Sequence, residues 1–155
     1  MQRFRSETVT LDDIVITEEL SKRSPRPPNL LSENQALHTL ARQLVNQPKT
    51  MLQNLVDISL DLCSTGTAGV SLLETTPNGS EVFRWNVLAG ALAQYVGGTT
   101  PRKESPCGVC LDRGVPVLFS HPERYFTYFQ VANTPIVEGL VLPLRAATPR
   151  KLFVQ

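Results

Sequence analysis

The chain has 155 residues, 41% of them hydrophobic, which is enough for one domain with a buried core and too few for two. Its 15 Lys and Arg against 14 Asp and Glu give a formal net charge of +1, so nucleic acid and membrane surfaces are not expected partners. The N-terminus carries acidic residues where a signal peptide would need an apolar stretch, and three irregularly spaced cysteines argue against a secreted disulfide framework. We predict a cytoplasmic protein.

The N-terminal part is predicted to be a linker followed by a helix. Residues 1–29 show no sustained periodicity, and SKRSPRPPN (21–29) packs three prolines and three basic residues into a stretch that cannot propagate a helix. Ser32 followed by Gln35 then makes a capping box, and apolar residues recur at helical spacing. This pattern predicts a first helix over about 32–46.

The next elements change from helix to sheet. Pro48 suits the start of a second helix, whose apolar face continues as far as Cys63, a residue we expect to be buried. The segments 68–74 and 81–90 are rich in β-branched, leucine and aromatic residues, and Asn78-Gly79 between them supplies the positive φ of a tight turn. An antiparallel hairpin is therefore predicted here.

The C-terminal part is predicted to consist of short elements joined by loops, because seven of the 12 prolines follow residue 100. In SPCGVCLDRG, Ser105 is a good N-cap, Pro106 suits the first helical position and Gly114 suits the residue after the end. This segment is predicted to be a short helix. The segment 115–120 (VPVLFS) is predicted to be a strand, and 138–144 (EGLVLPL) a buried strand.

The cysteines of this short helix allow a redox, a metal or a packing interpretation. Cys107 and Cys110 have the spacing of a thioredoxin motif, and a helix N-terminus would lower the pKa of Cys107, but such a motif should follow a buried parallel strand rather than the polar GGTTPRKESP. A structural metal site needs four protein ligands and a catalytic one needs three plus water, and only His121 lies near the two cysteines. We favour packing, with His121 in a solvated turn. No catalytic triad or paired carboxylates are visible.

The order of these motifs resembles the GAF domain, in particular the branch that serves as sensory input module of bacterial signal-transduction histidine kinases. The likeness covers residues 30–144 and is most specific in the pattern S-x-x-G-x-x-L-x-R-G-x-P, formed by Ser105, Gly108, Leu111, Arg113, Gly114 and Pro116. It implies an α+β fold, a GAF-like six-stranded antiparallel sheet flanked by helices. The paired N-terminal helices would cover one face, and a small-molecule pocket would lie on the other.

The resemblance also implies a function, a non-enzymatic module of signal transduction that senses a small ligand. A bilin or haem is disfavoured; for bilin attachment, Cys107 and Cys110 lack an adjacent histidine and the first thirty residues lack a cysteine. The cyclic-nucleotide motif of the family is also absent. The residues expected to border the pocket are Trp85, Tyr95, Ser105, Cys107, Gly108 and Phe119. Trp85 suits the core as well.

After residue 144 the chain departs from the family pattern. Residues 145–155 (RAATPRKLFVQ) are predicted to be a divergent tail, so that the closing strand and helix of the family are missing or replaced, with KLFVQ serving at most as an edge strand. This suggests a truncated sensor-kinase input domain, with a histidine kinase as possible partner and marginal stability as a monomer. The alternatives are a ligand-free interaction module that forms a homodimer through residues 30–63, and a CxxC thiol oxidoreductase.

Overall fold

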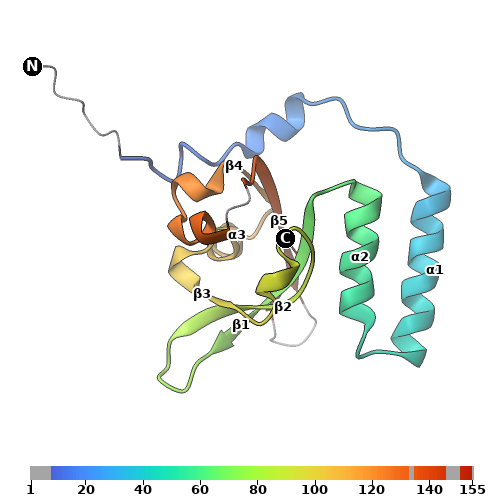
Figure 1. Cartoon of the computed structure of the whole chain (residues 1–155). Coiled ribbons are helices and arrows are strands. Elements are labelled where there is room, and N and C mark those ends of the chain that lie inside the picture. Colours follow the sequence, from blue (N-terminus) through green and yellow to red (C-terminus); the bar gives the residue numbers. More distant parts are fainter. Residues whose placement is uncertain (1–7, 133–134, 146–150, 155) are drawn as a thin grey trace, which may run out of the picture.

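The fold is a six-stranded antiparallel sheet with helices on both faces (Figure 1). The computed structural model describes residues 8–132, 135–145 and 151–154. The strands lie in the order β3-β2-β1-β6-β5-β4. In chain order the helices and strands are α1 Leu30–Asn46, α2 Met51–Cys63, β1 Thr67–Thr75, β2 Glu81–Gly90, β3 Thr99–Pro101, α3 Pro106–Arg113, β4 Val117–Ser120, β5 Glu138–Arg145 and β6 Lys151–Val154. Five short 3-10 helices join them: η1 Thr17–Lys22, η2 Ala93–Tyr95, η3 Arg102–Glu104, η4 Pro122–Arg124 and η5 Thr127–Ala132.

The two predicted N-terminal helices are confirmed, with different starting points. Asn29 rather than Ser32 caps α1, because the Asn29 side-chain oxygen accepts a hydrogen bond from the Ser32 amide at 3.1 Å. Helix α2 packs on β1 and β2 through Val56, which is fully buried. Cys63 was expected to be buried, and this was wrong: it lies in the last turn of α2 and is exposed.

The predicted hairpin is confirmed. Strands β1 and β2 pair in register from Thr67 opposite Gly90 to Thr75 opposite Glu81, with one irregularity after Val70. Gly79 has φ of +84°, the left-handed region that a residue with a side chain rarely adopts. The turn dipeptide therefore set the position of the longest strand pair in the sheet.

The C-terminal strand corrects one expectation of the sequence. The sequence predicts KLFVQ as at most an edge strand, but residues 151–154 form the interior strand β6, which pairs antiparallel with β1 on one side and with β5 on the other. A strand in the interior of a sheet satisfies backbone groups on both of its sides, so this position contributes more than an edge would. Residues 146–150, the first part of the predicted tail after β5, lie outside the described residues.

The segment before residue 30 also differs from a simple linker. Ile14 is fully buried, Val15 forms an antiparallel bridge with Phe119, and the Ser120 amide donates to the Ile14 carbonyl at 2.8 Å. This stretch thereby covers the outer edge of β4, which would otherwise present unpaired backbone groups. Residues 23–29 lead from it to α1 without a helix or strand.

Strand β5 is half-buried instead of buried. Val141 is 3% exposed, whereas Leu140 and Leu142 on either side of it are 41% and 37% exposed. Successive side chains of a strand point to opposite faces, so only one face of β5 packs on the core. The continuous apolar sequence EGLVLPL concealed this alternation.

Candidate functional site

Helix α3 is held by the predicted caps and by a close backbone contact. The Ser105 side chain accepts a hydrogen bond from the Cys107 amide at 3.1 Å, and Gly114 ends the helix with φ of +68°. A Cβ atom on Gly108 would lie 1.9 Å from the carbonyl oxygen of Arg102. Only glycine at this position lets η3 and α3 approach this closely.

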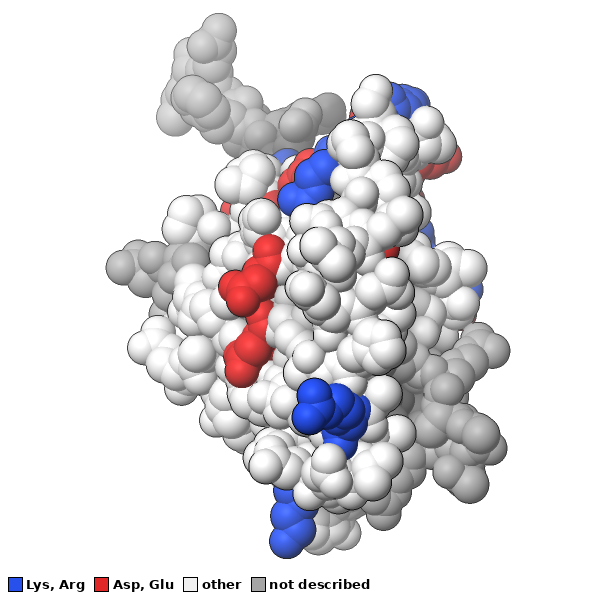
Figure 2. All heavy atoms as spheres, turned by 90° about the vertical axis from the view of Figure 1, so that its right-hand side faces the viewer, with Lys and Arg blue, Asp and Glu red and all other residues white. Residues whose placement is uncertain are grey.

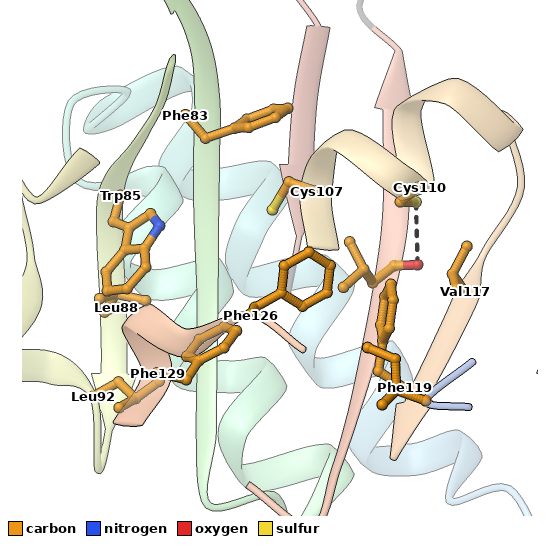
Figure 3. Close-up of a cluster of buried hydrophobic side chains, with 12 residues drawn as sticks. Phe83, Trp85, Leu88, Leu92, Cys107, Cys110, Val117, Phe119, Phe126 and Phe129 are labelled. Carbon is orange, nitrogen blue, oxygen red and sulfur yellow. Dashed lines mark hydrogen bonds between the residues drawn. The ribbon is translucent and has the colours of Figure 1, made fainter. Parts of the chain in front are cut away.

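Both cysteines of α3 face the sheet and are fully buried (Figure 3). The Cys107 sulfur lies 3.2 Å from the Ser71 hydroxyl oxygen, and the Cys110 thiol donates to the Val141 carbonyl at 3.4 Å. Burial raises the pKa of the Cys110 thiol to about 11. Reactive thiols need a lowered pKa and access to solvent, so this geometry supports the packing interpretation over the redox one.

An aromatic cluster surrounds Trp85 on the same face of the sheet as α3. The Trp85 ring stacks on Phe129 with 6.5 Å between centroids and meets Tyr95 edge-on at 6.4 Å. Tyr128 lies at 6.1 Å from Trp85 and at 4.4 Å from Phe129. Strand β2 supplies Trp85, and η5 supplies Tyr128 and Phe129, so the cluster joins one edge of the sheet to the loops that cover it.

Three buried polar atoms in this region have no hydrogen-bond partner: the Trp85 indole nitrogen, the Tyr128 hydroxyl and the Thr100 hydroxyl. Thr100 and Ser105 flank the Tyr128 hydroxyl, but neither forms a hydrogen bond of acceptable geometry with it. Burial raises the pKa of Tyr128, so this hydroxyl stays protonated. In Figure 3 the Trp85 nitrogen points into the interior, toward the side on which Cys107 lies. We call Trp85, Thr100, Ser105, Tyr128 and Phe129 the Trp85 site.

The structure distributes the residues predicted for the pocket over three places. Trp85 and Tyr95 meet in the aromatic cluster, with Trp85 8% exposed and Tyr95 partly exposed. Ser105, Cys107 and Gly108 lie together in the first turn of α3 and at its cap, all buried. Phe119 is on β4 and packs edge-on against Phe126 at 6.0 Å, away from the indole.

Sequence reasoning missed the contribution of η5 and β3. Tyr128 and Phe129 belong to the run RYFTYF, in which four of six residues are aromatic. Such a density in a proline-rich loop signals a covering element, because aromatic rings bury large apolar areas. Thr100 carried no comparable signal, since a threonine in a short strand is usual.

The described residues give little support to a metal site or to a functional role of His121. No group of three or more His, Cys, Asp and Glu side chains there is arranged to hold a metal ion. The imidazole of His121 is half-exposed in a turn, where its Nδ1 lies 3.2 Å from a carboxylate oxygen of Glu123. None of the described helices is long and apolar enough to cross a membrane.

Comparison with known proteins identifies the fold. No protein-family model and no curated protein sequence matches the chain. It is similar to the GAF domain of a phosphoenolpyruvate-protein phosphotransferase from Coxiella burnetii, with a TM-score of 0.63 and 13% identity over 82% of this chain and 77% of that one. It is also similar to the GAF domain of the phosphoenolpyruvate-protein phosphotransferase from Acinetobacter, with a TM-score of 0.54 and 15% identity over 78% and 75% of the two chains. The chain therefore has the GAF-like α+β fold that its sequence implied.

Proposed function

We propose that this protein is a cytoplasmic regulatory module that senses a small molecule at the Trp85 site. The observation that carries the proposal is the group of three unpartnered polar atoms, on Trp85, Thr100 and Tyr128, inside one aromatic cluster. A buried polar group without a partner costs about 1–3 kcal/mol, so a ligand that pairs with these atoms recovers a cost that the free protein bears. The GAF-like fold supports a sensory role by analogy.

The residues of the site define the chemistry of the ligand. The indole N–H of Trp85 requires an acceptor, and the hydroxyls of Thr100 and Tyr128 each donate or accept. The rings of Trp85 and Phe129 are nearly parallel, with 18° between their planes, and favour a flat partner. No charged side chain belongs to the site. We therefore infer an uncharged planar molecule with at least one carbonyl or ring-nitrogen acceptor, whose entry displaces η5.

The proposal is tested by native mass spectrometry of the purified chain and by thermal shifts against uncharged heteroaromatic compounds. A retained or stabilising compound is expected with the natural chain. The concentration of compound needed for a given thermal shift should rise at least tenfold in Trp85→Phe and in Tyr128→Phe. Each variant keeps an aromatic ring and loses one polar atom, whose hydrogen bond is worth about 1.4 kcal/mol or more. Tyr125→Phe is the matched control, because Tyr125 is 42% exposed and lies outside the Trp85 site. A chain that retains no compound and responds to none contradicts the proposal.

We further propose that the module regulates a phosphotransfer protein of a bacterial signalling pathway, with a sensor histidine kinase as the specific partner suggested by the sequence. The two similar structures are GAF domains of phosphoenolpyruvate-protein phosphotransferases, which also favours a phosphotransfer context. Sequencing the transcript on both sides of the region that encodes these residues tests this. A kinase-like or phosphotransferase-like coding region supports the proposal, and the absence of both contradicts it.

A second candidate function is homodimerisation through residues 30–63, favoured by the outer surface of α1. Leu30, Leu37 and Leu44 are 64%, 66% and 58% exposed and follow one another at intervals of seven residues, which places them on one side of the helix. Figure 2, which looks onto the α1 side, shows a broad uncharged surface with charged side chains only in small groups. A second copy of the same helix suits this stripe.

Size-exclusion chromatography with light scattering tests the dimer. The natural chain is expected to shift from monomer to dimer as its concentration rises, and Leu37→Gln should weaken this association at least tenfold without changing the melting temperature, because Leu37 is exposed. Arg42→Gln is the control, since a residue five positions further along lies on another side of the helix. A monomer at all concentrations contradicts the proposal.

A further inference from the structure

The stretch of chain before η1 is attached to the outer edge of β4 by a short ladder. The Ile16 amide donates to the Leu118 carbonyl at 2.9 Å, and the Ser120 amide donates to the Ile14 carbonyl at 2.8 Å. The Leu118 amide also donates to the Thr17 hydroxyl at 3.1 Å. These hydrogen bonds complete the edge of the sheet with a segment that lies about a hundred residues away in the chain.

One side chain of this stretch, Ile14, enters the core. It is fully buried in the larger core cluster, and partly buried apolar neighbours pack against the same cluster: Val9, Leu11 and Val15. A cavity of about 420 Å³ lies between residues 15–19 and Arg113 of α3, so the stretch is not packed closely on every side. We call residues 9–17 the edge segment. One buried side chain and a short ladder therefore provide most of its attachment.

The edge segment also contains a turn that it forms with its own residues. The amide and the hydroxyl of Thr10 each donate to a carboxylate oxygen of Asp13 at 2.7 Å. The amides of Ile14 and Val15 donate to the Leu11 carbonyl at 3.2 and 3.1 Å. Such local bonds between side chains and backbone form within a few residues. The segment can therefore present Ile14 in the same way wherever it binds.

The linker after the edge segment is anchored at two separate points. The Arg23 guanidinium donates to both carboxylate oxygens of Glu138 on β5, at 2.8 and 2.6 Å. Arg26 donates to a carbonyl at the end of α2. Figure 1 shows residues 23–29 leading from the β4 end of the sheet to α1 without a helix or strand. Three of these residues are prolines, which keep a linker extended and semi-rigid.

We propose that the edge segment binds in trans, so that two copies of this chain exchange residues 9–23 and each segment pairs with the β4 edge of the other copy. Every contact of the segment recurs between the copies, including Ile14 in the core and Arg23 at Glu138. The exchange therefore costs only what the linker requires, and the edge receives the sequence that already fits it. This surface is separate from the Trp85 site and from the apolar stripe of α1.

The first experiment adds a fluorescein-labelled peptide of residues 8–23 to the full chain and measures its affinity by fluorescence anisotropy. The natural chain should bind the peptide weakly, because its own edge segment competes. Ile14→Ala in the chain weakens this competitor, so the peptide should bind that variant at least tenfold more tightly. A peptide with the same Ile14→Ala change should bind both chains at least tenfold more weakly. Equal affinity of the two peptides, or of the two chains, overturns the proposal.

Two further variants separate exchange from a folding defect. Thr17→Val keeps the shape of the side chain and removes the acceptor of the Leu118 amide, so it should tighten the peptide about threefold or more. Leu20→Ala, at a residue 41% exposed, should leave the affinity unchanged. Bound peptide should also raise the melting temperature of the Ile14→Ala chain. Binding without this stabilisation would be binding to unfolded chain, and it overturns the proposal.

The second experiment tests the second copy as the occupant. Two full chains with different affinity tags are unfolded in urea, refolded together and captured by one tag. The other tag should be recovered with it, and an excess of the natural peptide should reduce this recovery about tenfold or more, whereas the Ile14→Ala peptide should not. Leu37→Gln should leave the recovery unchanged, in contrast to association through α1. Recovery that depends on Leu37 and not on the peptide, or no recovery, overturns the exchange.

Discussion

The thiols of this chain differ in burial, and burial decides their reactivity. Cys107 and Cys110 are 0% exposed, whereas Cys63 is exposed on α2. Alkylation requires the thiolate and access to it. Burial withholds access from both α3 thiols and raises the pKa of Cys110. Iodoacetamide at neutral pH is expected to modify the folded chain at Cys63 alone, as read by peptide mass spectrometry. A Cys63→Ser variant should remain unmodified until denaturant is added, and rapid modification of that folded variant would contradict the packing interpretation.

The Cys110 thiol also predicts how stability depends on pH. Burial raises its pKa from 9.0 in the unfolded chain to about 11, so the folded state favours the neutral thiol. Its contribution is fully present below pH 9 and is lost as the pH rises through about 11, because only the unfolded chain ionises between these values. Urea midpoints measured from pH 8 to pH 11 should fall. The fall should be smaller in Cys110→Ala, and an equal fall in both chains would assign it to other groups.

Position 108 requires glycine because of a steric contact and not because of its backbone angles. Gly108→Ala places a methyl group 1.9 Å from the Arg102 carbonyl oxygen, so η3 or α3 must shift, at a cost of about 1–3 kcal/mol. Gly66→Ala is the matched control, because its Cβ meets nothing within 4 Å. Urea unfolding should separate the two variants by at least about 1 kcal/mol. Similar stabilities would mean that the contact relaxes without cost.

At the scale of elements, the stretch before η1 acts as part of the sheet's edge. Ile14 is fully buried in the larger of the two core clusters, and the backbone of residues 14–16 is hydrogen-bonded to β4. Ile14→Ala is expected to reduce the free energy of unfolding by about 2–4 kcal/mol, which is the usual cost of a buried truncation of this size. Leu20→Ala, at a residue 41% exposed, should change it by no more than about 0.5 kcal/mol. If Ile14→Ala lowers the free energy of unfolding by less than about 0.5 kcal/mol in a urea titration, the stretch before η1 is not anchored to the sheet in solution.

At the scale of the whole molecule, β6 connects the two halves of the sheet. Leu152 is paired with Leu72 of β1 and with Leu144 of β5, so a proline there removes a donor from a strand with neighbours on both sides. Pro143 of β5 lies beyond the ladder with β4, which pairs with residues 138–141, and is opposite Phe153 of β6. Leu152→Pro is expected to abolish the cooperative thermal transition in circular dichroism. A preserved transition would place β6 outside the stable core.

Local signals predicted the local elements well. The Asn78-Gly79 turn, the Ser105 and Gly114 caps and the apolar spacing of the two N-terminal helices depend on residues close in sequence, and all appear in the structure. The position of β6, the burial of Ile14 and the exposure of Leu140 depend on which elements lie beside them. No short stretch of sequence contains that information.

The sequence by itself determined the α+β class, the antiparallel hairpin and the capped helix α3, because periodicity and turn chemistry act within a few residues. The GAF-like order of elements was implied by the resemblance of its motifs to that family. Only the tertiary structure decided the rest. It brought Tyr128 and Thr100 to Trp85 with three unpartnered polar atoms, and it placed β6 between β1 and β5. These features arise from contacts between residues distant in the chain, whose energies depend on burial and geometry that no local pattern encodes.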